Sequence, residues 1–208
     1  MPDSTGSQIV SRETTDMLKH YAQGIAKWTP RINLVASSQL QELWTRHILD
    51  SYQIAEHLPD QAEAITDLGS GGGLPGLVIA IHAKVHHPKR RITLVESDQR
   101  KSVFLRTMIG DLDLPATVQA KRIEDVQLPK ADVVTARALA SLDRLLELSH
   151  PLLKRDGLAV FPKGKSAADE LEIARRSWQF ACQEVQSLTN IDARILVIRN
   201  IERGTSRG

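Results

Sequence analysis

The sequence predicts an α/β fold, with a mostly parallel, seven-stranded sheet of the doubly wound, Rossmann-like kind and helices on both faces. Three observations support this. Short apolar runs alternate with helical patterns after about residue 60. The last two runs have no helix between them, which predicts a hairpin and one antiparallel edge strand. A cluster of glycines joins the first strand of the alternation to its helix.

Taken in order, the chain begins with a helical segment. Apolar residues at helical spacing predict one helix over about 7–28, ended by Pro30. A second helix begins at Ser37 or Ser38 and runs through Ile54. We therefore divide the chain into an N-terminal helical extension, residues 1–60, and a main domain, residues 61–208, with the polar start 1–6 expected to be disordered.

The main domain follows as strands and helices in alternation. Strands are expected at 64–68, 91–96, 116–120, 132–136, 158–161, 184–188 and 194–198. Helices are expected at 75–83, from Ser97 or Asp98 to about 110, at 141–148 and at 167–178.

Composition and charge exclude several classes of protein. The 208 residues are 41% hydrophobic and 25% charged, which is typical of a globular domain. We find no apolar run long enough to span a membrane and no signal-peptide pattern, so we expect a cytoplasmic protein. The single Cys182 excludes an internal disulfide and is expected to be a buried, inert thiol.

The distribution of charge permits a polyanionic partner. The formal net charge is +2, but residues 1–60 hold five Lys or Arg and seven Asp or Glu, which leaves +4 on the remainder. Each basic group could also be an ordinary solvated face. The basic groups are Lys89-Arg90-Arg91, Arg100-Lys101, Lys121-Arg122, Arg175-Arg176 and the tail with Arg199, Arg203 and Arg207.

The glycine cluster predicts a ligand at the end of the first strand. Gly71, Gly73 and Gly76 fit the dinucleotide fingerprint G-x-G-x-x-G. Asp67, Gly69, Gly71 and Gly73 fit the acidic-x-G-x-G-x-G pattern of S-adenosylmethionine (SAM) methyltransferases. Glycine reaches positive φ and leaves room for a ligand against the backbone. Together with the closing hairpin, this favours the class I SAM-dependent methyltransferase version of the fold.

The other strand ends carry further candidates, because ligands of open α/β sheets lie beyond the carboxyl ends of the strands. Glu96 ends the second strand, where an acid can accept both ribose hydroxyls or simply cap a helix. Residues 122–125, which include Ile123 and Glu124, follow the third strand and can either hold an adenine edge or form an ordinary solvated turn. Arg137 ends the fourth strand and needs an anionic partner, either a ligand or a carboxylate such as Asp67.

Other chemistries have weaker support. His82, His86 and His87 could suggest a metal, but no Cys or carboxylate lies beside them, so we expect no metal site. His47 and Asp50 lie on the second helix without an activated nucleophile or a G-x-S-x-G elbow. The chain has no phosphate-binding G-x-x-x-x-G-K-[ST] loop.

Motifs along nearly the whole chain resemble the RsmG (GidB) family of bacterial 16S rRNA guanine-N7 methyltransferases. The most specific are the helix ending His-x-x-Asp-Ser and the Arg-Ala pair after the fourth strand. The motifs are Asn33-Leu34, Arg46-His47-Ile48-Leu49-Asp50-Ser51, the stretch from Asp67 to Gly76, Val95-Glu96-Ser97 with Lys101 and Phe104-Leu105, Arg122-Ile123-Glu124, Ala136-Arg137-Ala138 with Ser141-Leu142, and Pro162-Lys163-Gly164-Lys165.

The resemblance implies SAM as co-substrate, with contacts at Gly69, Leu74, Ile123, Glu124 and Arg137. Glu96 occupies the position of the ribose acid, and Gly72 stands where relatives often have proline. The implied substrate is one guanine in the 530 loop of 16S rRNA, in naked RNA, an assembling subunit or the mature small ribosomal subunit. Nothing in the sequence suggests an obligate dimer, so we expect a monomer. We expect Arg137 to act by positioning, and no general base is needed because guanine N7 carries a free lone pair.

Three alternatives stay open at this stage. A SAM methyltransferase could act on a small molecule or a protein instead of RNA. A nicotinamide-dependent oxidoreductase could use Gly71, Gly73, Gly76 and Glu96, although the chain offers it no obvious catalytic Tyr-Lys or His-Asp pair. A non-catalytic ribosome-assembly factor could keep the same fold.

Overall fold

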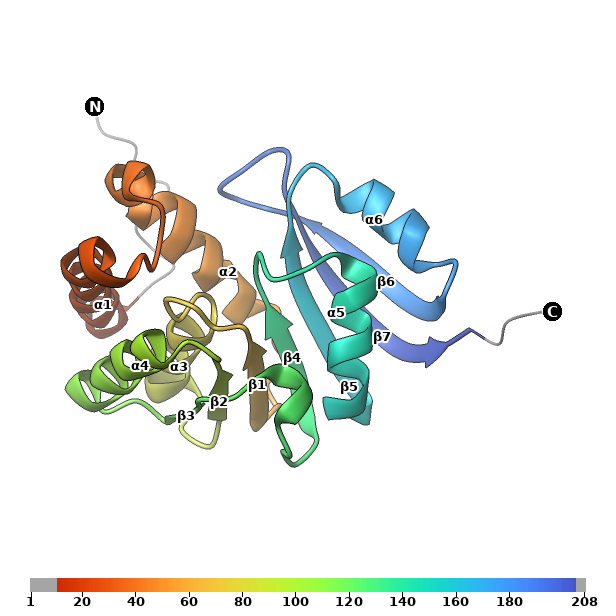
Figure 1. The fold of residues 1–208 in the computed structure, drawn as a ribbon, viewed down its shortest axis with the longest axis horizontal. Helices are drawn as coiled ribbons and strands as arrows, with labels where there is room; N and C mark the ends of the chain where they lie inside the picture. Colours follow the sequence, from red (N-terminus) through yellow and green to blue (C-terminus); the bar gives the residue numbers. More distant parts are fainter. Residues whose placement is uncertain (1–10, 205–208) are drawn as a thin grey trace.

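A computed structural model describes residues 11–204 of the chain. Its centre is one seven-stranded sheet with the strand order β3-β2-β1-β4-β5-β7-β6 (Figure 1). The strands are β1 (Ala64–Leu68), β2 (Arg91–Val95), β3 (Ala116–Gln119), β4 (Ala131–Ala136), β5 (Leu153–Lys163), β6 (Trp178–Gln186) and β7 (Arg194–Arg203).

The strand directions confirm the predicted, mostly parallel sheet. Strands β1 to β5 run parallel to one another. Strand β7 runs antiparallel to both β5 and β6, and it lies beside the outermost strand β6 at one edge of the sheet. The order reverses between β1 and β4, so the carboxyl ends of these two strands flank the switch point where ligands of such folds bind.

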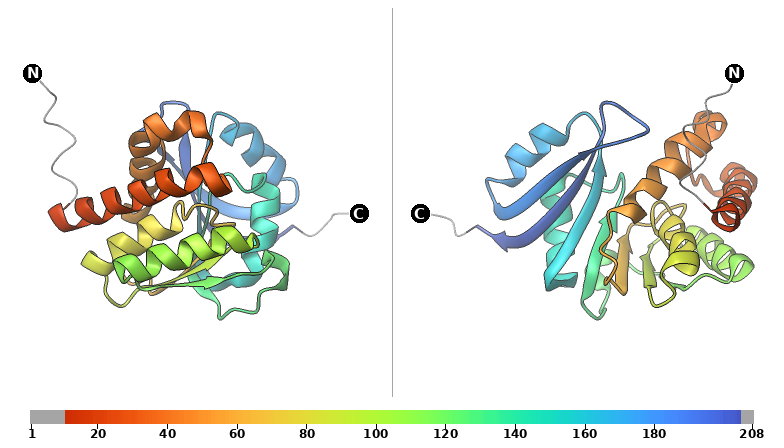
Figure 2. Two further views of the ribbon diagram at one scale, coloured as in Figure 1. Left: turned by 60° about the vertical axis from the view of Figure 1, so that its left-hand side comes forward. Right: turned by 180° about the vertical axis from the view of Figure 1, so that it is seen from behind.

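Helices cover both faces of the sheet (Figure 2). They are α1 (Arg12–Ile32), α2 (Asp50–Glu56), α3 (Gly76–His86), α4 (Gln99–Leu112), α5 (Leu142–Ser149) and α6 (Ala167–Ala174). One apolar cluster contains side chains of the four helices α1, α2, α3 and α4 together with strand residues such as Val133 and Val197. The other contains side chains of α5 and α6 together with the strand residues Val134 and Leu196. Neighbouring strand residues thus face opposite cores, as the two-residue period of a strand requires.

Helix α1 extends past the proline that was predicted to end it. Pro30 lies inside the helix, which ends at Asn33, where φ is 50° and the N–H bonds the carbonyl of Thr29. A proline in the last turn removes one backbone hydrogen bond, and the buried face of α1, which includes Leu18, Tyr21 and Ile25, supplies packing that outweighs this loss.

The predicted second helix is divided into three pieces. A 3₁₀ helix (Ser37–Glu42) is followed by a π-helical turn (Trp44–Leu49) and then by α2. A π-helical turn inserts an extra residue per turn and is frequent at functional sites. It changes the direction in which Arg46, His47 and Asp50 point, relative to a continuous α-helix.

Several smaller expectations were wrong. Trp178 begins β6 and does not end a helix, because the residues after it alternate between exposed and less exposed positions. Arg90 is not part of a solvated basic face: it is 1% exposed and donates to the carbonyls of Ala62 and Pro59 at 3.0 and 2.6 Å. Cys182 is half-buried on β6 and not fully buried as expected, but burial still raises its thiol pKa to about 11, so the thiol is protonated at neutral pH, which agrees with the expected inert thiol.

Within residues 11–204, no helix is both long enough and apolar enough to cross a membrane.

Candidate functional site

The loop between β1 and α3 lies at the switch point of the sheet. Its glycines Gly69, Gly71 and Gly73 have φ of 62°, 56° and 93°, which L side chains rarely adopt. Glycine at these positions therefore lets the chain turn sharply from β1 toward the N-terminus of α3.

The glycines have different surroundings. A Cβ at Gly71 would have only the carbonyl of Gly69, at 3.8 Å, within contact range, so this position opens into free space. At Gly73 it would stand 2.6 Å from Leu77 and 2.9 Å from the hydroxyl of Tyr21. Gly71 therefore leaves room for a ligand, whereas Gly73 leaves room for the packing of the protein itself.

Helix α1 contacts this loop directly. Tyr21, which is fully buried, donates its hydroxyl hydrogen to the carbonyl of Gly72 at 2.6 Å. Leu34 lies against Gly72, where an added Cβ would be 3.4 Å from it. The predicted N-terminal extension thus holds the glycine loop in place.

Glu96 lies opposite the glycine loop at the end of β2. Its side chain is 8% exposed, and its two carboxylate oxygens accept hydrogen bonds of 2.7 Å from the N–H groups of Gly71 and Asp98. Each oxygen of a carboxylate can accept more than one hydrogen bond. Glu96 therefore orders the loop and keeps acceptor capacity toward the space beside it.

The space between these groups is a cavity of about 780 Å³, here called the cofactor pocket. Seven of the eight predicted cofactor residues line it, and Gly73 does not. The seven are Gly69, Gly71, Leu74, Glu96, Ile123, Glu124 and Arg137. The carboxylate of Glu124 also pairs with Arg144 at 2.6 Å on the exposed side of the pocket.

Asp67 lies in β1, just before the glycine loop. It is completely buried and accepts a hydrogen bond of 2.7 Å from Thr135 on β4. Burial raises the pKa of its carboxyl from 3.8 to about 6, an effect that the Thr135 bond partly opposes. Its Oδ2 would be 2.6 Å from a Cβ on Gly76, so Gly76 allows α3 to approach β1 closely.

Arg137 has a different internal partner from the one the sequence suggested. Its guanidinium lies 3.3 Å from the carboxylate of Asp50, not against Asp67, and it donates to the carbonyl of Arg46 at 2.8 Å and to Ser51 Oγ at 3.3 Å. The Arg137 side chain is only 18% exposed, and burial lowers its pKa. These partners bring together the two motifs on which the family resemblance was most specific.

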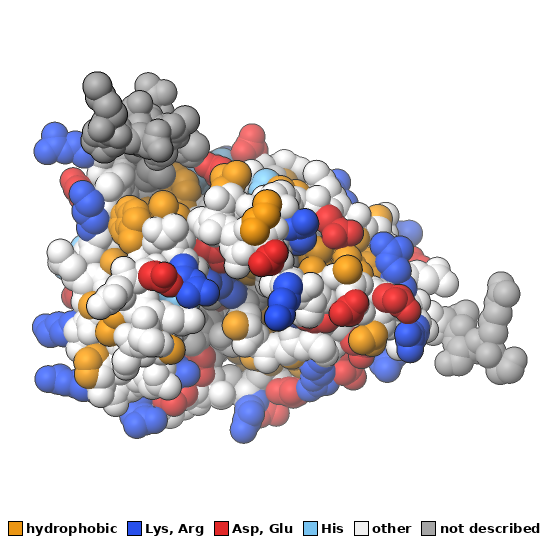
Figure 3. Space-filling model, turned by 90° about the horizontal axis from the view of Figure 1, so that it is seen from above, with side chains coloured by type: hydrophobic (Ala, Val, Ile, Leu, Met, Phe, Trp, Pro, Cys, Tyr) orange, Lys and Arg blue, Asp and Glu red, His pale blue; other side chains and the backbone are white. Residues whose placement is uncertain are grey.

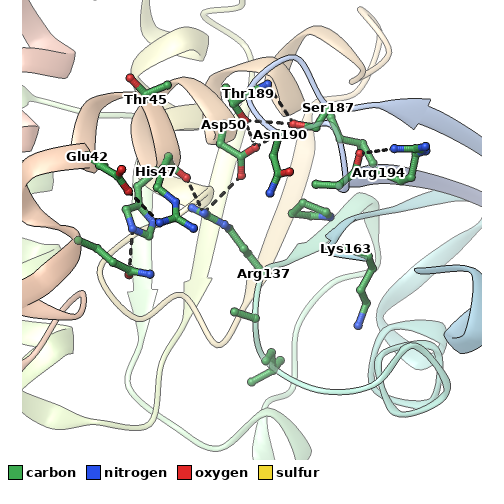
Figure 4. A pocket seen from close by; sticks show the side chains of 18 of the residues that line it. Glu42, Thr45, His47, Asp50, Arg137, Lys163, Ser187, Thr189, Asn190 and Arg194 are labelled. Atoms are coloured by element: carbon green, nitrogen blue, oxygen red, sulfur yellow. Dashed lines mark hydrogen bonds and ion pairs between the residues drawn. The ribbon is translucent and has the colours of Figure 1, made fainter. Parts of the chain in front are cut away.

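A second cavity of about 1200 Å³, here called the outer cleft, adjoins the cofactor pocket (Figure 4). Its walls come from the 39–50 segment, the loop after β4, the end of β5 with Lys163, and the β6–β7 loop. Six residues line both cavities: Gln39, His47, Arg137, Ala138, Leu139 and Ala140. A molecule in the outer cleft would therefore border a molecule in the cofactor pocket across Arg137 and its loop.

The loop after β4 is fixed from the side of β5. Lys163 donates to the carbonyl of Ala140 at 2.7 Å and pairs with Glu170 at 2.7 Å. Glu170 also accepts the N–H of Leu142 at 2.7 Å. Leu139, within this loop, stands over Gly69, where an added Cβ would be only 2.5 Å away. The loop is thus a partition between the two cavities.

His47 lies near Arg137, and both residues line the two cavities. Burial, and after it the nearby Arg137 charge, lower the pKa of His47 from 6.5 to about 4. Its Nε2 is 3.2 Å from Gln39 Oε1. The ring is therefore neutral at pH 7, so His47 adds no positive charge next to Arg137.

The histidine cluster lies at the end of α3, with His87 directly after the helix. The expectation that no carboxylate lies beside it was wrong, because Asp60, 27 residues earlier in the chain, lies 4.0 Å from His87 Nε2. The rings of His82 and His86 are 4.6 Å apart, and His82 is 9% exposed with a pKa lowered to about 4 by burial. In the described part of the chain, no group of three or more His, Cys, Asp or Glu side chains is placed to hold a metal ion.

On the face seen from above in Figure 3, positive and negative side chains are interspersed, with hydrophobic side chains between them. A polyanion on this face would therefore meet scattered cations and not one continuous basic patch.

Solved structures that share this architecture include two O-methyltransferases with SAM or SAH bound. The O-methyltransferase TomG from Streptomyces achromogenes, solved in complex with SAM, aligns with a TM-score of 0.60 and 13% identity over 93% of this chain and 92% of that chain. An O-methyltransferase from Bacillus cereus in complex with SAH has a TM-score of 0.60 and 12% identity over 93% of both chains. The fold is that of class I SAM-dependent methyltransferases.

Sequence comparison defines the family within this class. The family model "rRNA small subunit methyltransferase G" (GidB) matches residues 14–200. Ribosomal RNA small subunit methyltransferase G of Cereibacter sphaeroides is 46% identical over 96% of this chain and 97% of its own length. That of Gluconobacter oxydans is 45% identical over 93% and 97%. The chain belongs to the GidB family of small-subunit rRNA methyltransferases, as the resemblance predicted.

Proposed function

We propose that the protein transfers a methyl group from SAM to N7 of a guanine in the 530 loop of 16S rRNA. The observation that carries the proposal is the pair of adjoining cavities that share Arg137 and the 138–140 loop. Direct transfer requires the reacting atoms of the two molecules to come within about 3 to 3.5 Å of each other, and cavities that share lining residues bring two bound molecules to a common border. Membership of the GidB family, whose relatives are named for small-subunit rRNA methylation, supports RNA as the acceptor.

The residues of the smaller cavity fit SAM. The free space at Gly71, the buried acid Glu96 and the loop near the N-terminus of α3 form a site for a ligand that presents a ribose and a charged chain. In this proposal Glu96 accepts from the ribose hydroxyls, Ile123 and Glu124 border the adenine, and Gly69, Gly71 and Leu74 contact the cofactor, with Gly73 shaping the loop from behind. When bound, SAM supplies a methyl group already activated by a positively charged sulfur.

The chain has little proton chemistry to perform in this reaction. Guanine N7 carries a lone pair in the plane of the base, so the acceptor needs no deprotonation. The pKa of His47 is lowered to about 4, which makes its ring a weak base, and Arg137 is a cation paired with Asp50, so neither is suited to act as a base. We infer that Arg137 positions the acceptor nucleotide, and that Leu139, standing over Gly69, limits the access of water to the partition.

Competing functions predict different measurements. Equilibrium dialysis should show SAM binding and no comparable NAD binding, and the reverse result would indicate an oxidoreductase. Transfer of a labelled methyl group to small-subunit RNA should occur with guanosine-containing RNA and not with RNA containing 7-deazaguanosine, which lacks N7. Transfer to both RNAs would contradict N7 methylation. SAM binding without RNA methylation would favour another substrate or an assembly role.

The proposal includes the setting of the reaction. Because the acceptor is ribosomal RNA, we propose that the protein acts in the cytoplasm as a monomer on the small subunit or its RNA. We also propose that it uses no metal, since N7 methylation needs no Lewis acid.

A further inference from the structure

Asp50 occupies a central position in the outer cleft (Figure 4). It begins α2, directly after the π-helical turn, and its side chain is 14% exposed. A carboxylate this far from water is unfavourable unless its oxygens are paired. Both oxygens of Asp50 have partners, and the partners come from different parts of the chain.

One oxygen faces the end of β4. Asp50 Oδ2 lies 3.3 Å from the guanidinium of Arg137, which also donates to the carbonyl of Arg46 and to Ser51. Arg137 is thereby held against the 46–51 segment instead of extending freely into either cavity. Without Asp50, the guanidinium would lose its only ionic partner among the described residues, although it would keep its hydrogen bonds.

The other oxygen faces the β6–β7 loop. Asp50 Oδ1 accepts hydrogen bonds from Thr189 at 2.6 Å, from Ser187 at 3.2 Å and from Gln53 at 2.9 Å. Gln53 in turn accepts the N–H of Leu188 at 2.9 Å. The loop between the last two strands is therefore fixed to the first sixty residues through one carboxylate and its neighbour.

These contacts join three walls of the outer cleft. The 39–50 segment, Arg137 and residues 187–190 all border the cavity, and Asp50 is bonded to each of the other two walls. Asp50 does not line the cofactor pocket. A change at Asp50 should therefore alter the shape of the outer cleft much more than that of the cofactor pocket.

We propose that Asp50 is a positioning residue that sets the shape of the RNA-binding cleft and the orientation of Arg137 within it. The proposal rests on the assignment of the outer cleft to RNA. It makes RNA binding depend on Asp50 much more strongly than SAM binding, because Asp50 lines only the outer cleft whereas Arg137 lines both cavities.

Two substitutions test separately the contact of Asp50 with Arg137 and its contact with the β6–β7 loop. In Asp50→Asn, the amide oxygen can still accept from Thr189 and Ser187, but the amide nitrogen then faces Arg137, so donor meets donor. Thr189→Val keeps the shape of the side chain and removes the shortest bond to the loop. Glu56→Gln, an exposed change of the same type six residues further along α2, is the matched control.

The experiment is steady-state methyl transfer to small-subunit RNA by the full-length variants, with SAM affinity measured by calorimetry and folding checked by circular dichroism. Asp50→Asn should raise KM for RNA by about tenfold, the change expected for losing a charged partner, with SAM affinity within about twofold of wild type. Thr189→Val should raise KM for RNA by about threefold, and Glu56→Gln should leave both quantities unchanged.

A second readout needs no activity. Amide hydrogen exchange in residues 187–193 should be faster in Asp50→Asn and in Thr189→Val than in wild type, with the exchange of α3 unchanged. If Asp50→Asn does not fold, Thr189→Val decides the question by the same two measurements.

The proposal is overturned if the folded Asp50→Asn protein, or Thr189→Val in its place, keeps the wild-type KM for RNA, or loses SAM and RNA affinity equally. Unchanged exchange in 187–193 also overturns it. If the wild-type protein itself fails to methylate small-subunit RNA, the proposed function fails, while the exchange measurement still tests the junction.

Discussion

The two cavities of this protein are built in different ways. The cofactor pocket is formed mainly by short motifs at the ends of neighbouring strands, with its glycine loop and Glu96 only 25 residues apart. The outer cleft is formed by segments far apart in the chain, joined by contacts such as Thr189 to Asp50, 139 residues apart. The first is a property of the fold class, whereas the second depends on how this chain adds its N-terminal helices and its last hairpin.

This difference predicts that the pockets can be damaged separately. Changes at the glycine loop should act on cofactor affinity, and changes at the junction of Arg137 and Asp50 should act on the acceptor. The following predictions test that separation, beginning with the largest expected effect.

Gly71→Val should lower SAM affinity by about a hundredfold, because a branched side chain is costly at φ 56° and would fill the free space in the pocket. Calorimetry on the folded protein measures this effect. Gly110→Val, at an exposed helical glycine with nothing within 4 Å, is the control and should bind SAM normally. Normal SAM binding by Gly71→Val would place the cofactor elsewhere.

Arg137→Lys should reduce methyl transfer by roughly ten- to a hundredfold with little loss of thermal stability. Lysine keeps the charge but cannot bond Asp50, Arg46 and Ser51 with one planar group. Arg176→Lys, at an exposed ion pair with Glu172, is the control and should be fully active. Full activity in Arg137→Lys would reduce Arg137 to a structural role.

The outcome at Arg137 shows what the sequence could and could not predict. The strands, the glycine loop and Glu96 were predictable because each depends on residues that are close in the chain or on the regular alternation of strands and helices. The strand end also predicted that Arg137 needs an anionic partner. It did not predict Asp50 as that partner, because Asp50 comes 87 residues earlier.

Other parts of the site were missed for the same reason. The sequence from Ser37 to Ile54 predicts one continuous helix, but the structure has a π-helical turn at Trp44–Leu49. Within this turn, the carbonyl of Arg46 accepts a hydrogen bond from Arg137. Lys163, in the Pro162–Lys165 motif, donates to the carbonyl of Ala140 and pairs with Glu170. The spacing of the motif alone could not predict these contacts. One indication of this junction was present in the sequence: the Arg46–Ser51 and Ala136–Ala138 motifs were the two that made the resemblance to the family most specific.

Glu96→Gln should weaken SAM binding by about tenfold and leave KM for RNA within about twofold of wild type. The amide nitrogen of glutamine would face an N–H donor, either that of Gly71 or that of Asp98, so the loop and the ribose site would both lose an acceptor. Isothermal calorimetry and RNA titrations of the same variant measure the two effects. An equal loss of RNA affinity would mean that the pockets are not separable.

The titration of two histidines should destabilise the protein between about pH 6.5 and pH 4. This effect is partly opposed by Asp67, whose raised pKa of about 6 makes the folded chain take up a proton before the unfolded chain does. His47 and His82 each have a pKa lowered to about 4, so the unfolded chain binds protons that the folded chain does not, and stability falls as the pH drops through this range. His47→Gln and His82→Gln should each reduce the loss by about 1 kcal/mol, a value limited by solvent screening.

The two histidines differ in their position relative to the proposed active site. Only His47 lines the cavities, so only His47→Gln should also shift the acid limb of methyl transfer. Thermal melts and activity profiles from pH 4 to pH 8 provide both readouts. Identical profiles for wild type and both variants would contradict these assignments.

The proposed function is tested most directly by mapping N7-methylguanosine in small-subunit rRNA from cells with and without this protein. We expect one N7-methylated guanine in the 530 loop that is present with the wild-type protein, absent without it, and not restored by Gly71→Val. Methylation of that guanine in cells lacking the protein, or a protein-dependent methyl group only at another atom or another base, would contradict it.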